Sequence, residues 1–167
     1  MKAVFVCCAI AACGMKVSAA PFQNLGFDDA NTNNISLTQT ESGVIGSGPV
    51  TDLLPGWQLL KGTNAVSTLG FDLLTGTSYE TLLSATGSYP NIVEGACSLA
   101  LHDPSNVPYS LIQWGTVPVD AQVLSYKYYG DAFNVQINDQ MLPPLLGNLS
   151  RSTYGNWPLF DISAFSG

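Results

Sequence analysis

The chain has 167 residues and carries twelve acidic against five basic side chains, which gives a net charge of −7. Nucleic acids and anionic membrane surfaces are bound through clustered Lys and Arg side chains, so these few scattered cations argue against both as partners. The length fits one domain. Few charges together with many Ser, Thr, Asn and Gly residues are typical of an extracellular β-protein rather than a cytosolic enzyme.

The N-terminus has the pattern of an export signal. Lys2 precedes an uncharged apolar stretch from Ala3 to Met15, and Val17-Ser18-Ala19 offers the small residues that a signal peptidase reads. This stretch is shorter than the roughly 20 apolar residues that cross a bilayer. We therefore predict a signal peptide over residues 1–19, cut after Ala19, and one β-sandwich domain over residues 20–167.

Two other interpretations of the N-terminus stay open. The apolar stretch also fits a buried N-terminal helix. In addition, Ile10-Ala11-Ala12-Cys13 resembles the lipobox of bacterial lipoproteins. Acylation at Cys13 would hold the mature chain at a membrane surface.

Removal of residues 1–19 changes the charge and the cysteine content. Three basic residues then face twelve acidic residues, so the net charge becomes −9, and Cys97 is the one cysteine left. An exported domain with one cysteine has no internal disulfide. The apolar context of Cys97 predicts a small buried side chain.

Short strands separated by turns are predicted for the first half of the domain, because Gly and Pro recur throughout and no long window has a helical apolar period. Thr77–Ala85 fits either a strand or a helix with a capping box between Thr77 and Glu80. In chain order we expect a strand at Phe22–Phe27, a long surface loop from Asn31 through Gly43, Gly46 and Gly48 to Pro49, a turn at Pro55-Gly56-Trp57 leading into a strand through Leu60, and a strand at Ala65–Phe71.

Alternation of apolar and polar residues is clearest in the second half. Ser98–His102 places Leu99 and Leu101 on one face of a strand. Phe133–Ile137 alternates strictly, and Asn138-Asp139 then predicts a tight hairpin, because both residues tolerate positive φ. The other expected features are a turn at Asp103–Asn106, strands at Ser110–Trp114 and Ala121–Tyr129, a returning strand through Met141 and Leu142, and a break at Pro143-Pro144.

This pattern predicts an all-β fold, a two-sheet antiparallel β-sandwich of the jelly-roll type, with a closed barrel as the structural alternative. The apolar segment Trp157–Phe165 is followed only by Ser166-Gly167. A fold that ended at this segment would leave a sheet edge or a core face uncovered, and natural sheets avoid such exposed edges. We therefore expect the last strand or strands to be missing from the chain.

Several short motifs carry a resemblance to a known family. They are Asn24-Leu25-Gly26-Phe27-Asp28, Pro55-Gly56-Trp57, Glu94-Gly95 before the strand at Ser98, Ile137-Asn138-Asp139 and Asp161–Gly167. On these the chain resembles secreted PEP-CTERM sorting-type proteins of exopolysaccharide-producing Gram-negative bacteria. Their β-sandwich is similar to galactose-binding-like and carbohydrate-binding jelly rolls. The resemblance implies an exported protein of the cell surface, anchored through a C-terminal tail that residues 1–167 do not contain.

The residues give little support for catalysis. His102 is the only histidine, its alternation with Leu99 and Leu101 points it to solvent, and no Gly-x-Ser-x-Gly elbow occurs. Glu80, Glu94 and Asp103 could supply a carboxylate pair, although any chain with twelve acids offers such pairs. We expect no catalytic residues and no enzymatic activity.

Calcium is the cofactor that the sequence allows, although none is required. One histidine and one cysteine exclude an ordinary zinc site, whereas calcium binds carboxylate and loop carbonyl oxygens. The family resemblance implies a structural calcium near the first strand. Asp28, Asp29 and Glu94 are its candidate ligands, with solvated turn acids as the alternative.

Aromatic rings are the candidate ligand-binding residues, because they stack on the apolar C–H faces of sugars. Among the Trp and Tyr residues we select Trp57, Trp114, Tyr128 and Tyr129, the last because either Tyr128 or Tyr129 must face outward. The predicted function is an exported, non-catalytic module that contacts extracellular polysaccharide. A purely structural or adhesive surface protein is the alternative, and a secreted hydrolase is the third hypothesis.

Overall fold

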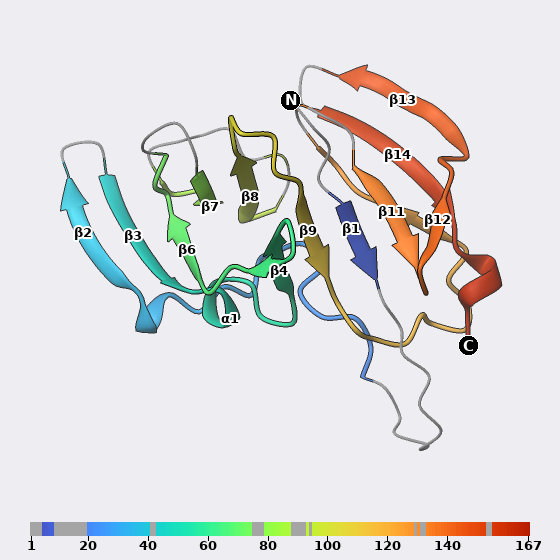
Figure 1. Cartoon of the computed structure of the whole chain (residues 1–167), viewed down its shortest axis with the longest axis horizontal. Coiled ribbons are helices and arrows are strands. Elements are labelled where there is room, and N and C mark those ends of the chain that lie inside the picture. Colours follow the sequence, from blue (N-terminus) through green and yellow to red (C-terminus); the bar gives the residue numbers. More distant parts are fainter. Residues whose placement is uncertain are drawn as a thin grey trace.

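The computed structural model describes residues 5–8, 20–40, 43–74, 79–87, 93, 95–128, 130, 133–152 and 155–167. The fold of this part is all-β, as predicted, and its strands form three sheets where two were expected (Figure 1). Helical structure in these ranges is limited to α1 (Val50–Leu53) and the 3-10 turns η1 (Thr32–Asn34) and η2 (Ser163–Phe165). No helix in these ranges is long and apolar enough to cross a bilayer.

A six-stranded sheet occupies the centre of the molecule, in the order β12-β11-β1-β9-β4-β5. β1 pairs in parallel with both β9 and β11, and the remaining pairs of this sheet are antiparallel. Its strands are β1 (Phe5–Cys8), β4 (Gln58–Lys61), β5 (Asn64–Ala65), β9 (Tyr109–Ile112), β11 (Asn134–Ile137) and β12 (Gln140–Leu142).

The other two sheets lie on opposite sides of the central strands in Figure 1. A five-stranded sheet has the order β2-β3-β6-β7-β8, with β2 (Ser36–Thr40), β3 (Gly43–Pro49), β6 (Thr68–Phe71), β7 (Tyr79–Ser84) and β8 (Cys97–His102). A three-stranded antiparallel sheet has the order β10-β14-β13, with β10 (Val123–Ser125), β13 (Leu146–Ser152) and β14 (Gly155–Asp161).

Two apolar cores hold these sheets together, which is consistent with a β-sandwich. In the first core, leucines of β6 and β7 pack with Leu59 of β4 and Leu111 of β9, so the five-stranded sheet covers one part of the central sheet. In the second core, Val135 and Ile137 of β11 pack with Phe160 of β14. Burial of every second residue of β11 is the alternation that the sequence predicted.

The expected surface loop over Asn31–Pro49 is instead the turn η1 followed by the β2–β3 hairpin. Glycine is needed here for close packing rather than for a loop. A Cβ at Gly48 would lie 2.3 Å from the side chain of buried Ile35, and a Cβ at Gly46 would lie 2.7 Å from the Ser36 carbonyl. The prediction was wrong because a glycine in a strand that allows close backbone approach gives the same sequence signal as a glycine in a loop.

The predicted strand at Phe22–Phe27 is also absent. Asn24 and Phe27 have φ of 49° and 62°, values that strands do not adopt, and the Phe27 amide donates to the Asn24 carbonyl in a turn. Leu25 of this segment is 56% exposed, whereas Phe22 packs against the second core and Phe27 against the first, each partly buried. Their burial explains the apolar pattern without a strand.

Other predicted elements are present with changed bounds. The ambiguous Thr77–Ala85 segment contains the strand β7, and its residues from Thr81 to Ser84 are all buried. The predicted strand at Ala121–Tyr129 is shortened to β10, after which Tyr128 forms an isolated bridge with Asn156. Cys97 is buried and has no disulfide, as expected.

The hairpin between β11 and β12 is confirmed. Asn138 and Asp139 have φ of 50° and 62°, and Val135 pairs with Leu142 across the turn. Two residues with positive φ match the right-handed twist of the strands that they connect.

Substitution at Asp139 tests this turn. Asp139→Val should lower the free energy of unfolding by about 1–2 kcal/mol, because a β-branched residue is strained at positive φ. Asp139→Gly removes the same carboxylate but adopts this φ readily, and should leave stability close to that of the parent. Urea unfolding measures both, and an equal loss in both variants would contradict the turn geometry.

Candidate functional site

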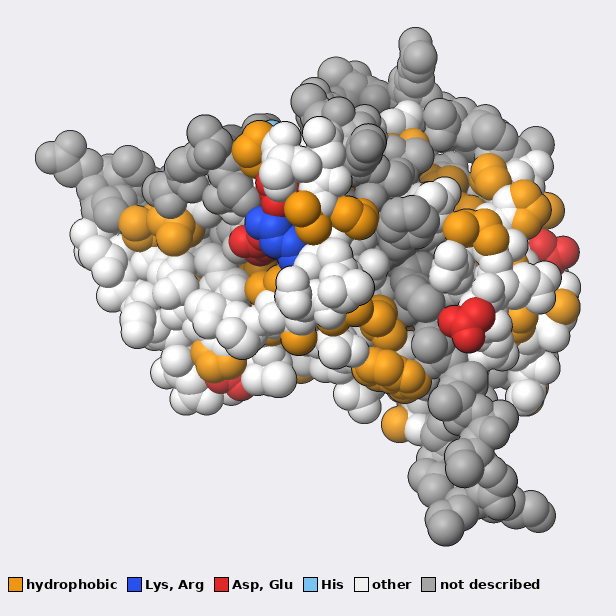
Figure 2. Space-filling view, in the orientation of Figure 1, with side chains coloured by type: hydrophobic (Ala, Val, Ile, Leu, Met, Phe, Trp, Pro, Cys, Tyr) orange, Lys and Arg blue, Asp and Glu red, His pale blue; other side chains and the backbone are white. Residues whose placement is uncertain are grey.

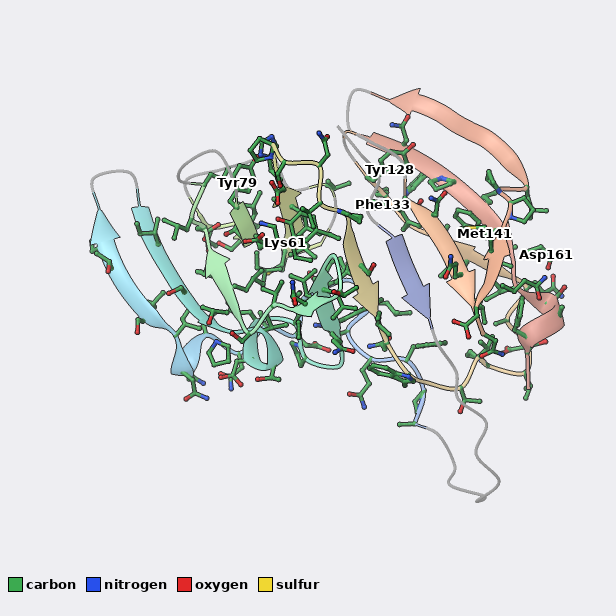
Figure 3. The ribbon with its side chains drawn as sticks, viewed as in Figure 1. Lys61, Tyr79, Tyr128, Phe133, Met141 and Asp161 are labelled. Carbon is green, nitrogen blue, oxygen red and sulfur yellow. The ribbon has the colours of Figure 1, made fainter. Side chains whose placement is uncertain are left out.

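Two of the predicted ligand-binding rings are covered by neighbouring residues, one in part and one almost completely. Trp57 is half-buried against the first core, and its Nε1 donates to the Asn24 carbonyl at 2.9 Å. Tyr128 is only 5% exposed, and its ring lies 5.7 Å from that of Phe133, beside it in Figure 3. The buried Tyr128 ring offers no face for stacking, which argues against its selection, whereas Trp57 keeps part of its surface exposed.

The other two predicted rings differ from these. Trp114 follows β9 at the surface and is 53% exposed. Tyr129 lies outside the described residues, so its selection stays a prediction. Trp114 belongs to the end of the central sheet, whereas the site described next lies on the three-stranded sheet.

The three-stranded sheet has one face on the second core and an outer face away from it. Leu124 of β10 pairs with Phe160 of β14, and both belong to the second core. Directly paired residues share a face and the next residues take the other one. Ser125 and its partner Leu159 therefore lie on the outer face.

Trp157 and Lys127 are the next pair along this outer face. Trp157 is 46% exposed, and the Nζ atom of Lys127 lies 4.0 Å from the centre of its ring. This is a cation–π contact, which fixes the ring at a modest gain of about 0.5–1 kcal/mol for an exposed pair. We call Trp157, Lys127, Ser125 and Leu159 the outer aromatic site.

Sequence reasoning counted Trp157 among the available rings but did not select it. The signal was present in the strand predicted at Ala121–Tyr129, in which Leu124, Tyr126 and Tyr128 share one face. Inward positions at these residues leave Lys127 facing outward, and the bridge between Tyr128 and Asn156 aligns Lys127 with Trp157. The pairing of β10 with β14 was the missing information.

The carboxylate of the calcium candidate Asp28 is a structural acceptor. Its Oδ1 accepts the amide hydrogens of Ala96 and Cys97 at 2.8 and 3.0 Å, which ties the N-terminal turn to the start of β8. Asp29 is exposed, and Glu94 lies outside the described residues. No group of three His, Cys, Asp or Glu side chains comes together in the described ranges, and calcium binding stays a prediction.

Four polar side chains form an ionic cluster at one end of the first core. Lys61 of β4 contacts Glu80 of β7 at 3.0 Å and Asp103, after β8, at 2.9 Å. The hydroxyl of buried Tyr109 donates to the same Glu80 oxygen, Oε1. Figure 2 shows the cluster as basic atoms bordered by acidic atoms, at the position where Figure 3 labels Lys61.

The electrostatics of this cluster favour a structural role. Hydrogen bonds from Ser105 and then from Lys61 lower the pKa of Asp103 to about 2. Hydrogen bonds to Asp103 and Glu80 raise the pKa of Lys61 above its usual value. Burial, followed by the contact with Glu80, raises the pKa of Tyr109 to about 12. A general acid needs a pKa close to the working pH, so Asp103, held ionised by these hydrogen bonds, is poorly suited to act as a general acid.

His102 is more constrained than the predicted solvated strand end. It is partly buried, and its ring stacks on Tyr79 with the two ring centres 5.2 Å apart. The turn after it formed as expected, since the Asn106 amide donates to the Asp103 carbonyl at 3.2 Å.

Acid titration of stability tests the ionic cluster. A carboxylate whose pKa is lowered by folding stabilises the protein above its unfolded pKa of about 4, and this contribution is lost as the pH falls towards 2. Asp103→Asn should therefore flatten part of the stability loss between these pH values. Asp120→Asn removes an exposed carboxylate as the control. Equal acid profiles for the parent and Asp103→Asn would contradict the assignment.

Comparison with known proteins adds no assignment, because no family model, no curated protein and no solved structure matches this chain.

Proposed function

We propose that this chain is an exported, non-catalytic β-sandwich module of the surface or extracellular matrix of a Gram-negative bacterium, and that it contacts a neutral polysaccharide. The observation that carries the proposal is the outer aromatic site, where a half-exposed Trp157 is held by Lys127 on the outer face of the three-stranded sheet. Export rests on the N-terminal sequence pattern.

The chemistry of the outer aromatic site suits a sugar. The indole face of Trp157 offers an apolar surface for sugar C–H groups, and the Ser125 hydroxyl and the Lys127 ammonium can hydrogen-bond sugar hydroxyls. Ser125 and Lys127 alternate on the same side of β10, and β14 supplies the ring. A solvent-exposed sheet face fits an extended polymer better than an enclosed small molecule.

The charge of the domain favours a neutral polymer. Residues 20–167 contain three basic and twelve acidic side chains. One of these cations, Lys61, is engaged by Glu80 and Asp103. The resulting negative field repels uronic-acid or sulfated chains, most strongly at low ionic strength.

The other parts of the proposal rest on the sequence motifs. The jelly-roll topology and the similarity to galactose-binding-like PEP-CTERM proteins are supported by the short motifs that include Pro55-Gly56-Trp57 and Ile137-Asn138-Asp139. The non-catalytic role is supported by the ion pairs that Lys61 forms with both Glu80 and Asp103, two of the carboxylates considered for hydrolysis from the sequence.

An adhesive role without a sugar ligand is the second candidate. Val123 and Leu145 are both more than half exposed and flank the C-terminal end of β14, because Val123 pairs with Asp161 on one side and the Leu145 amide donates to the Leu159 carbonyl on the other. With Trp157 they give this sheet an apolar character that would also suit a protein surface.

Binding to a panel of neutral and acidic polysaccharides tests the proposal. The exported chain should bind at least one neutral polymer, and Trp157→Ala should weaken this binding by about tenfold or more, which is above about 1.4 kcal/mol. Lys127→Gln should weaken it less, because it removes only the charge. Affinity electrophoresis with each polymer measures the shifts.

Met141→Ala is the matched control, because Met141 is exposed to the same degree as Trp157 but lies on β12 of the central sheet. It should bind like the parent. Loss of binding in Met141→Ala, full retention in Trp157→Ala, or binding to acidic polymers alone would each argue against the proposal.

A further inference from the structure

β1 completes the central sheet by pairing on both sides. Phe5–Cys8 aligns with Asn134–Ile137 of β11, and Phe5–Cys7 aligns with Ser110–Ile112 of β9. Since neighbouring strands lie about 4.8 Å apart, one strand fills the space between β9 and β11. We call this space, bordered by residues 110–112 and 134–137, the β9–β11 slot.

The slot has a defined chemistry along both edges. None of the seven residues that border it is charged. Leu111 and Val135 align with the same position of β1, and both are buried, as is Ile137 two residues further along β11. An occupant therefore needs apolar side chains at alternate positions, and a backbone that pairs with both neighbours.

The slot also lies between the two cores. Leu111 of β9 belongs to the first core, whereas Val135 and Ile137 of β11 belong to the second. In the central sheet, β9 pairs with β4 and β1, and β11 pairs with β12 and β1, so these two strands are joined only through the strand between them. Without an occupant, both would present unpaired amide and carbonyl groups beside buried side chains, which is costly.

Residues 5–8 fall inside the segment that export would remove. We propose that the β9–β11 slot is a strand-acceptor site, which Phe5–Cys8 fills in the precursor and an extended apolar segment of a partner polypeptide fills after cleavage. This inference rests on the export part of the proposed function. Recognition is by main-chain pairing on both edges, with specificity from the apolar residues that face the cores.

A peptide-binding experiment tests the acceptor site. The probe is a labelled synthetic peptide with the sequence of residues 2–10 carrying Cys7→Ser and Cys8→Ser. The exported chain, whose new N-terminus is verified by mass, is compared with a cut-resistant Ala19→Arg chain that keeps its own β1. Fluorescence anisotropy should show saturable binding to the processed chain, and binding at least about tenfold weaker to the cut-resistant chain.

A second peptide that also carries Val6→Pro is the control, because proline cannot complete the pairing of a central strand. It should bind at least about tenfold more weakly than the first peptide. The inference is overturned if both peptides bind equally well, or if both chains bind the first peptide equally well. It is also overturned if amide exchange at Leu111 and Val135 is slow in the processed chain without peptide, because the slot would then have closed. The inference also fails if the exported chain keeps residues 1–19. Polysaccharide binding is measured independently in both chains, so failure of the acceptor site and failure of the proposed function can be told apart.

Discussion

Burial of every second side chain in β11 and β14 is the constraint on which the rest of this structure depends. Val135 and Ile137 pack with Phe160 in the second core. Because strand side chains alternate, the position of Phe160 fixes the opposite orientation of Leu159, and the pairing with β10 then places Ser125 beside it. The outward orientation of the residues in the outer aromatic site therefore follows from the packing of the second core on the other face of the same sheet.

The first core uses different means to position its strands. Leucines from the five-stranded sheet and from β4 and β9 fill it, and glycines of β3 allow the hairpin to pack closely on Ile35. Polar contacts also join the strands around this core. The Asp28 carboxylate accepts a hydrogen bond from the backbone just before β8, and Lys61 of β4 forms ion pairs with Glu80 and Asp103. These contacts account for charged residues that a search for catalytic groups would otherwise select.

Sequence reasoning recovered the features that are coded locally. The Asn138-Asp139 turn and the strand after Pro55-Gly56-Trp57 depend on neighbouring residues, and both are present. The β2–β3 hairpin was missed, because the role of Gly48 is set by its distance to Ile35, which is distant in sequence from it.

The candidate site was predictable in kind but not in detail. Exposed aromatic residues were expected, and Trp114 is one. Tyr128 could not be separated from the exposed rings, because its burial depends on packing beside Phe133 and on its bridge to Asn156 in β14. Selection of Trp157 needed the same strand pairing, which alternation within one strand does not reveal.

The most direct test of the account is amide hydrogen exchange of the exported chain with and without the neutral polysaccharide that it binds most tightly. Binding on the outer aromatic site predicts slower exchange in β10 and β14 and unchanged exchange in β2 and β3. Slower exchange confined to the neighbourhood of Trp114, or no change in β14 at saturation, would contradict the account.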